Sequence, residues 1–536
     1  MKVLCRRPFQ AALLAVGLCL FGALAVAPAA AESVLNRGIG ATIGTLDPQV
    51  NFLATEGFIL DDIYEGLIDY DANGQIVPGA AEKWDVSDDG LTYTFHLRDG
   101  LKWSSGEPLV AQDFANGIIR TLDPATASDK GYIFVTTVAV AGAADFNGGT
   151  NKDPASVGVT APDAKTLVIK LTKPAPYALL LMSSFYAPPL HKPSLDKFGK
   201  DFIKPENIVS NGAYKMVENV PQSHVTLVKN PNYWDAASVK IDKVVYKVTE
   251  DDNTAVKLWR AGDLDITVDI PSDQIDKLKA EFGDQVHVSS STETVYESFN
   301  LKKPPFDNPK LREALSLAID RDALINKVVK GGYSVNCGYA IPIADYDAPK
   351  VPDCAMSKDD RIAKAKQLYA EAGFGPDKPL SLAIESTNSD SPKKVSETIA
   401  VMWKQTLGID AKVHAQDRDS WLAAFSAGNW DVFNDDLVGD FAGPESYLSY
   451  MDPRAGSGYN WPSPEYEAAM DKALVVSDKA ERYKLLAAAE KILLDSYLTA
   501  PIAAGPNRHL VRSTVKGWGD NPPDWHSSRL MSVAAP

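Results

Sequence analysis

Cysteine and histidine are scarce in this chain, which has 536 residues but only four cysteines and seven histidines. It contains no Gly-x-Ser-x-Gly nucleophile elbow and no His-Glu-x-x-His metal motif. The histidines are isolated from one another along the sequence, at His96, His191, His224, His287, His414, His509 and His526. These absences argue against an enzyme, although a secreted peptidase is kept as an alternative. We expect no catalytic residues, no metal and no cofactor.

Long apolar runs are absent beyond the amino terminus. Residues 1–31 have a basic start, an apolar run from Ala11 to Ala27, and the triplet Ala29-Ala30-Ala31. This is the pattern of a secretory signal peptide, with cleavage near Ala31/Glu32. No later stretch is long enough to span a bilayer, and the residues before Cys19 make a poor lipid-attachment box. The sequence therefore predicts a soluble exported protein rather than a lipoprotein.

Two cysteines, Cys337 and Cys354, remain after the signal peptide. A close pair in an exported chain favours a disulfide. The alternative is a metal-binding thiol pair, which the lack of nearby histidines disfavours.

Charge narrows the choice of partners. Without residues 1–31 the chain keeps 51 basic and 70 acidic residues, a net charge of −19. Such a surface argues against nucleic acid or an anionic membrane as the main partner and favours a monomer. The length predicts two or more domains.

The first part of the chain reads as strand-rich and the later part alternates helices with strands. Alternation of Leu91, Tyr93, Phe95 and Leu97 with polar residues predicts a strand with one buried face, on which His96 is half-exposed. Further strands are expected at 165–171, 224–229 and 244–248. Helices that start at Asn308 and Asp320 are followed by a helix at 359–372, a strand at 380–384, a helix at 392–407, a strand at 409–413, a helix at 420–427, a strand at Trp430, and helices at 464–474 and 479–496. This order predicts an open α/β sheet.

The most informative stretch is Gly439-Asp440-Phe441-Ala442-Gly443-Pro444-Glu445. It follows the short apolar strand that contains Trp430, so it stands at the carboxyl end of a strand, where α/β proteins bind ligands. Pro444 suits a first helical position and Glu445 the positive end of the helix dipole. Asp440 could hold a cation such as an α-amino group. Its alternative role is to cap the helix. A cation site formed by Asp435, Asp436 and Asp440 is disfavoured, because hard cations need more oxygen ligands.

Several motifs carry a resemblance that covers nearly the whole mature chain. They are Gly44-Thr45-Leu46-Asp47-Pro48, Tyr64-Glu65-Gly66-Leu67, the run from Glu82 to Trp103, Ala111-Gln112-Asp113-Phe114, Asn211-Gly212-Ala213-Tyr214, Lys303-Pro304-Pro305-Phe306 and Ala318-Ile319-Asp320-Arg321. In this order and spacing they resemble the family 5 extracellular solute-binding proteins, the receptors of peptide ABC importers. Within that family, the pattern is most similar to the oligopeptide-binding subfamily at Gly439-Asp440, Pro444, Tyr459-Asn460 and Ser463-Pro464.

The resemblance implies an α/β, two-lobed periplasmic binding protein of type II, with three structural domains and a ligand cleft closed by a hinge. The expected domains are a discontinuous core of lobe 1 (32–75, 206–300 and 510–536), an accessory domain of lobe 1 (76–205) and an α/β lobe 2 (301–509). The implied partners are an oligopeptide ligand and an inner-membrane ABC permease with its ATPase subunits. Oligosaccharide, opine and nickel chelate remain alternative ligands.

The resemblance also implies a set of ligand contacts. Asp440 matches the carboxylate that holds the peptide's amino group. Phe52-Leu53-Ala54-Thr55 matches a segment that pairs with peptide backbone by strand addition. Asp269 and Ile270 match polar contacts, and Tyr296 and Tyr132 match aromatic positions near the cleft, the latter with an ambiguity of one residue. Trp421 and Trp430 could line side-chain pockets, although core packing explains them equally well.

Departures from the family pattern affect specificity. Asn434 and Phe425 stand where relatives have arginines that bind the carboxyl end of short peptides, so a strict length preference is not expected. Asn434 is retained as a ligand candidate. The family's disulfide positions match Glu293 and Val438, which excludes that bridge here.

Overall fold

The structure is a computed structural model that describes residues 32–40, 43–51, 53–249, 251–455, 458–459 and 461–534. The expected signal peptide and Phe52 therefore lie outside the described residues. Within these ranges, no helix is long and apolar enough to cross a bilayer. Three larger sheets, of four, four and six strands, organise the chain.

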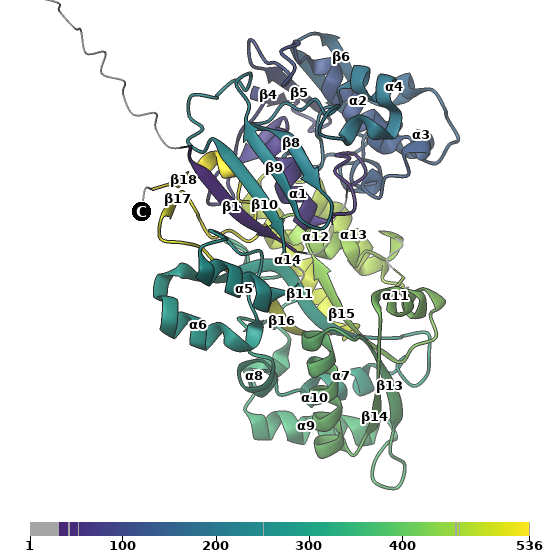
Figure 1. Ribbon diagram of the computed structural model, residues 1–536. Coiled ribbons are helices and arrows are strands. Elements are labelled where there is room, and N and C mark those ends of the chain that lie inside the picture. The colour runs from purple at the N-terminus through teal and green to yellow at the C-terminus, as the bar shows by residue number, and fades with distance from the viewer. Residues whose placement is uncertain are drawn as a thin grey trace, which may run out of the picture. The chain divides into compact units, whose positions relative to one another are not determined.

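The first four-stranded sheet joins the start of the described chain to a segment that comes much later. Its strand order is β1-β10-β9-β8. Strand β1 (Val34–Ile39) runs parallel to β10 (Lys243–Val248), and β9 (His224–Lys229) is antiparallel to both β10 and β8 (Tyr214–Val220). Helix α1 (Ala54–Ile63) packs close to β8 (Figure 1). The chain thus leaves this sheet after β1 and returns to it at β8.

The second four-stranded sheet is formed by the intervening segment. It has the order β4-β5-β7-β6, with every neighbouring pair antiparallel. Its strands are β4 (Ala81–Val86), β5 (Thr92–Leu97), β6 (Val159–Asp163) and β7 (Thr166–Lys170), and its helices are α2 (Ala111–Leu122), α3 (Ala143–Asn147) and α4 (Lys192–Phe198). On β5 the side chains of Tyr93, Phe95 and Leu97 are buried, and His96 is half-buried. The predicted alternation along this strand is confirmed.

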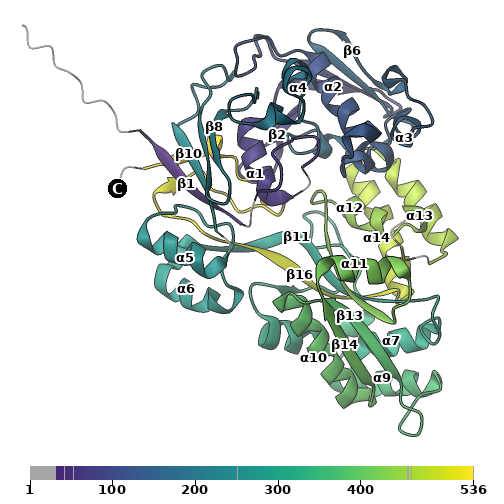
Figure 2. The same cartoon turned by 45° about the vertical axis from the view of Figure 1, so that its right-hand side comes forward.

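The six-stranded sheet is mixed and has the order β12-β16-β11-β15-β13-β14. Its strands are β11 (Val286–Phe299), β12 (Ser334–Val335), β13 (Ser381–Thr387), β14 (Asp410–Gln416), β15 (Val432–Val438) and β16 (Thr499–Leu510). Strand β13 is parallel to β14 and β15, whereas β11 is antiparallel to β15 and β16. Three helices accompany this sheet: α7 (Pro309–Leu317), α9 (Lys358–Glu371) and α10 (Asp390–Leu407) (Figure 2). Helix α10 contacts β13, β14 and β15, and α9 contacts both α7 and α10. Fully buried Trp403 lies in their shared apolar core.

The helices predicted in the later part are confirmed, with boundaries within a few residues, except that the one capped by Asp320 is α-helical only over Arg321–Ala323 and continues as a π-helix, η8 (Leu324–Val329). Asn308 and Asp320 act as amino-terminal caps, since their side chains accept hydrogen bonds from the backbone of Lys310 and Ala323. The remaining helices are α5 (Asp252–Ala261), α6 (Ile275–Phe282), α8 (Arg321–Ala323), α11 (Arg418–Ala427), α12 (Pro444–Tyr450), α13 (Pro464–Leu474) and α14 (Lys479–Asp495). The short strands are β2 (Ile68–Tyr70), β3 (Ile76–Pro78), β17 (Val515–Lys516) and β18 (Ser532–Val533).

Cys337 and Cys354 form the predicted disulfide. Their Cα atoms are 6.3 Å apart, and the bond closes the loop that follows β12. Glu293 on β11 lies directly opposite Val438 on β15. The two positions matched to the family's own bridge are therefore neighbours across the strands, although neither carries a thiol.

The segment expected to add to a peptide strand differs from that expectation. Helix α1 already begins at Ala54, so Ala54 and Thr55 have helical backbone, whereas Leu53, the amino-terminal cap, is extended. The Glu56 carboxylate accepts hydrogen bonds from the backbone N–H groups of Gly44 and Thr45, which ties the preceding loop to the first turn of α1. Backbone contact here would come from the free N–H groups at a helix start rather than from a strand edge.

Candidate ligand site

Asp440 lies two residues beyond the end of β15 and before α12. The cap of α12 is Gly443, so the capping role for Asp440 is excluded. Instead, one carboxylate oxygen, Oδ1, accepts a hydrogen bond from the Tyr132 hydroxyl at 2.7 Å. The Tyr186 hydroxyl lies 3.1 Å from the Asp440 carbonyl oxygen and 3.4 Å from Oδ1. The Ser446 hydroxyl accepts from the Asp440 N–H at 2.8 Å and fixes the turn.

The electrostatic state of Asp440 is unusual for a carboxylate. Burial raises its pKa, and the hydrogen bonds from Tyr132 and Tyr186 oppose that rise only in part. Across the described ranges no lysine or arginine forms an ion pair with it. A buried carboxylate of this kind gains much from a cation that donates hydrogen bonds. The site can therefore accept an ammonium group.

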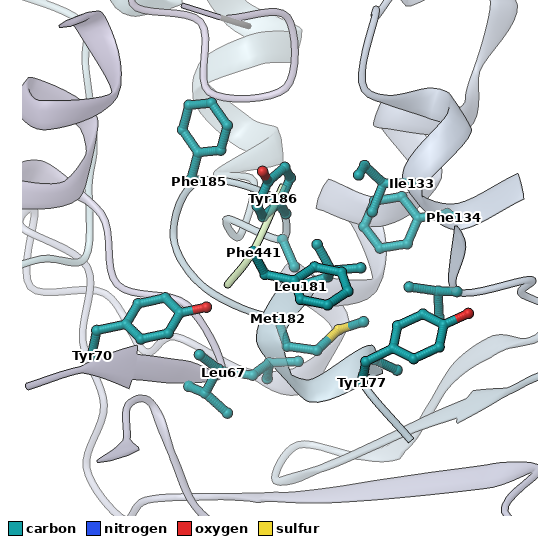
Figure 3. Packing of buried hydrophobic residues seen from close by; sticks show 14 of the residues in the cluster. Leu67, Tyr70, Ile133, Phe134, Tyr177, Leu181, Met182, Phe185, Tyr186 and Phe441 are labelled. Atoms are coloured by element: carbon teal, nitrogen blue, oxygen red, sulfur yellow. The ribbon is translucent and has the colours of Figure 1, made fainter. Parts of the chain in front are cut away.

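Phe441 fixes this turn against the segment that carries the tyrosines. Its ring is 2% exposed and stacks on Tyr177, with ring centroids 5.6 Å apart and planes inclined by 16°. Figure 3 shows Phe441 among Leu181, Tyr186 and Tyr177. Tyr132 itself precedes a π-helical turn, η2 (Ile133–Thr137), and remains 37% exposed. The site thus joins the loop after β15 to two separate stretches of the preceding part of the chain.

Asp269 and Tyr296, two other predicted contacts, already have partners within the protein. Asp269 accepts two hydrogen bonds from the Arg508 guanidinium, at 2.8 and 2.9 Å. Tyr296 is fully buried and donates to Asp435 Oδ2 at 3.1 Å. Ile270 is fully buried in an apolar cluster. Asp269 can therefore accept hydrogen bonds from a ligand only at positions on its carboxylate oxygens that Arg508 does not occupy.

Asn434 is also engaged, with a buried glutamate. Its side-chain N–H group donates to Glu297 Oε1 at 2.8 Å. Burial raises the pKa of Glu297 to about 8, so this carboxyl group is largely protonated at neutral pH. Asn434 also lines a cavity between the sheet and the start of α10, together with Glu293, Asp436 and Tyr333. A contact between Asn434 and a ligand remains a prediction.

Trp421 and Trp430 are packed in an aromatic cluster. Both are at most 5% exposed. Trp430 stacks on Phe425 with centroids 5.7 Å apart, and Trp421 lies 4.7 Å from Phe433. Their burial is consistent with core packing, and a role of either tryptophan in lining a side-chain pocket stays a prediction.

The structure also revises the view of the acidic and histidine residues. Asp435 and Asp436 alternate along β15, so their side chains point to opposite faces of the sheet.

The histidines are not all isolated in space, because the rings of His287, His509 and His526 each contact Trp518. Sequence spacing could not show this gathering.

Sequence reasoning missed Tyr186, Tyr177 and Phe441 as parts of the site. Tyr177 and Tyr186 lie in a stretch rich in apolar residues and prolines, where nothing distinguishes them from core tyrosines. Their role depends on contacts with residues more than 250 positions away. Only the tertiary structure brings them together.

Comparison with known proteins places this geometry in context. Residues 75–459 match the model of the protein family described as bacterial extracellular solute-binding proteins, family 5, middle region. The chain is 33% identical over 507 residues to the periplasmic murein peptide-binding protein MppA of Escherichia coli, covering 94% of each chain. It is 34% identical to the periplasmic oligopeptide-binding protein OppA of the same organism, covering 94% of this chain and 93% of that one.

Solved structures agree with these relatives. The unliganded open form of MppA matches with a TM-score of 0.81, 33% identity, and coverage of 94% of this chain and 98% of that chain. OppA of Haemophilus influenzae, in complex with the peptide RPPGFSPFR, matches with a TM-score of 0.80, 32% identity, and coverage of 94% and 99%. The protein has the fold of the periplasmic binding proteins, and it belongs to the family 5 bacterial extracellular solute-binding proteins, which are transport receptors and not enzymes.

Proposed function

We propose that this chain is the periplasmic receptor of an ABC importer and that it binds oligopeptides through their α-ammonium group. The observation that carries the proposal is Asp440, a half-buried carboxylate bonded to two tyrosine hydroxyls and, in the described ranges, to no basic side chain. A peptide ammonium supplies both the charge and the donors that this environment favours.

The other parts of the proposal follow from family membership and from the sequence. A signal peptide cleaved near Ala31/Glu32 would deliver the chain to the periplasm, where the related MppA and OppA also reside. The domains would follow the boundaries given above, and a peptide that contacts both lobes would favour their closure. The loaded receptor would act as a monomer and pass its peptide to an inner-membrane permease driven by ATPase subunits.

The ligand class is the part that needs an experiment. One relative, 30% identical over 521 residues, is named a probable deoxycholate-binding periplasmic protein, so non-peptide ligands occur among similar chains. Native mass spectrometry of protein purified without denaturation would reveal a retained ligand. A mixture of peptides added to the protein should then give complexes in which the mass of each bound peptide stays constant with time, because the receptor binds peptides without hydrolysing them. A retained bile acid or saccharide, with no uptake of peptide, would contradict the proposal.

A further inference from the structure

A second cluster of polar groups lies apart from Asp440, near the carboxyl terminus. His509 is on β16, whereas Asp524 and His526 belong to the segment between β17 and β18. His509 Nε2 and His526 Nε2 each lie 2.9 Å from Asp524 Oδ1. The three potential ligand atoms lie within 4.8 Å of one another. Two imidazole nitrogens and one carboxylate oxygen thus converge on one point.

The contacts of the two Nδ1 atoms leave both Nε2 atoms directed at Asp524, where each can bind a metal once its proton has moved away. His509 Nδ1 lies 2.9 Å from the Thr267 carbonyl oxygen, which can only accept, so Nδ1 carries a proton. A histidine that donates through one nitrogen to a carbonyl commonly binds metal through the other. His526 Nδ1 lies 3.5 Å from Asn521 Nδ2, which makes shorter contacts with the carbonyl oxygens of Trp525 and Gly519. That long contact can be given up at little cost.

The surroundings hold the two rings rigidly and keep one side accessible. The side chains of His509 and His526 are 6% and 3% exposed, and that of Asp524 is 21% exposed. Trp518 stacks on His526 with ring centroids 3.7 Å apart. Rings held in this way lose little further freedom when they bind an ion. The more exposed carboxylate offers a route from solvent.

We propose that His509, Asp524 and His526 bind one divalent transition-metal ion. Two neutral imidazoles and a carboxylate suit a borderline-soft ion such as Zn²⁺, with water in the fourth position. His509 donates through both ring nitrogens, so it releases its Nε2 proton as the ion enters, whereas His526 shifts its proton from Nε2 to Nδ1 and both rings bind as neutral imidazoles. The bound ion joins β16 directly to the segment between β17 and β18. The inference does not depend on the identity of the transported ligand.

The test uses the full mature protein without a histidine tag, after treatment with a chelator. Calorimetry with Zn²⁺ should show one saturable site, with an observed enthalpy that changes with the ionisation enthalpy of the buffer because a proton is released. Added Zn²⁺ should raise the melting temperature. Co²⁺ should give visible absorption bands typical of four-coordinate nitrogen and oxygen ligation. Cu²⁺ should quench the fluorescence of Trp518, which lies against the site.

Three variants distinguish this site from adventitious binding. His526→Gln and His509→Gln should weaken Zn²⁺ binding about tenfold or more. Asp524→Asn keeps an oxygen that can accept from both rings but removes the charge, so it should weaken binding without preventing folding. The matched control His224→Gln alters a histidine whose ring pairs with Glu218 on another sheet, and it should leave the affinity unchanged. Absence of a saturable site in the wild type, or equal affinity in Asp524→Asn, would overturn the proposal.

Discussion

The Tyr132 hydroxyl donates a hydrogen bond of 2.7 Å to Asp440 Oδ1, across 308 positions of sequence. Tyr132 belongs to the segment of the second sheet and Asp440 to the loop after β15 of the third. In this structure the phenol occupies part of the hydrogen-bonding capacity that a peptide ammonium would use. Ligand binding would therefore rearrange an existing contact rather than fill an unused one.

Peptide affinity should fall on acidification at a higher pH than for an ordinary aspartate. Burial raises the pKa of Asp440 above its usual value of 3.8. A bound ammonium favours the ionised carboxylate, so affinity is full above the raised pKa and is lost as pH falls through it. Calorimetry from about pH 6.5 down to about pH 5, where the peptide's amino end stays protonated and its carboxyl end ionised, would show the decline. The decline should be absent in Asp440→Asn, and an equal decline in that variant would assign it to another group.

Phe441→Ala should weaken the association of the β15 loop with the segment that carries Tyr177. Loss of the stacked pair removes about 0.5–1.5 kcal/mol beyond the buried area. We expect a larger radius of gyration by small-angle scattering, and weaker peptide binding. Phe374→Ala is the matched control, because Phe374 also stacks, on Tyr369, but within one part of the chain. Equal scattering changes in both variants would indicate general destabilisation instead.

Glu297→Gln should make the protein more stable at alkaline pH and leave it nearly unchanged at acid pH. The folded protein raises the pKa of Glu297 from 4.5 to about 8, so its folded state retains a proton that the unfolded chain has released. Stability from this group is complete below pH 4.5 and is lost as pH rises to about 8, by at most about 1.4 kcal/mol per pH unit. Gln keeps an oxygen for Asn434 without that loss. Thermal melting at pH 5 and pH 9 would test it, with exposed Glu371→Gln as control.

Acetylation of a peptide's amino end should cost more affinity than amidation of its carboxyl end. Asp440 can contact the amino end. Two residues replace the family's arginines: Asn434 is buried and bonded to Glu297, and half-buried Phe425 stacks on Trp430. Peptides lengthened at the carboxyl end should still bind. Competition among free, acetylated, amidated and lengthened forms of one peptide would decide the matter. Greater damage from amidation would mean that another cation binds the carboxylate.

Much of the fold was predictable because local signals and tertiary structure agree. The alternation on β5, the caps at Asn308 and Asp320, and Pro444 at the first position of α12 each fix an element locally. Asp440 could be singled out as a candidate by its place after a strand and by the family resemblance, but only the structure shows that Gly443, and not Asp440, caps α12. The start of α1 at Ala54 was missed, since it depends on Glu56 and the loop that it organises.

Residues whose function depends on distant partners could not be predicted in this way. Trp421 and Trp430 have the same residue type whether they line a pocket or fill a core, and their burial becomes known only from the structure. His509 and His526 share no motif, yet Asp524 brings their rings together. Tyr186 acquires its contact with Asp440 only when two parts of the chain meet.

Calorimetry of one free-amine peptide against wild type and Asp440→Asn tests the central claim most directly. The amide has nearly the same shape but cannot balance an ammonium charge. The expected loss is roughly 1.5–3 kcal/mol, or about 10- to 100-fold in dissociation constant. The acetylated peptide should bind both proteins with similar, weaker affinity. Unchanged affinity of the free-amine peptide for Asp440→Asn would contradict the assignment of Asp440 as the acceptor of the peptide's amino group.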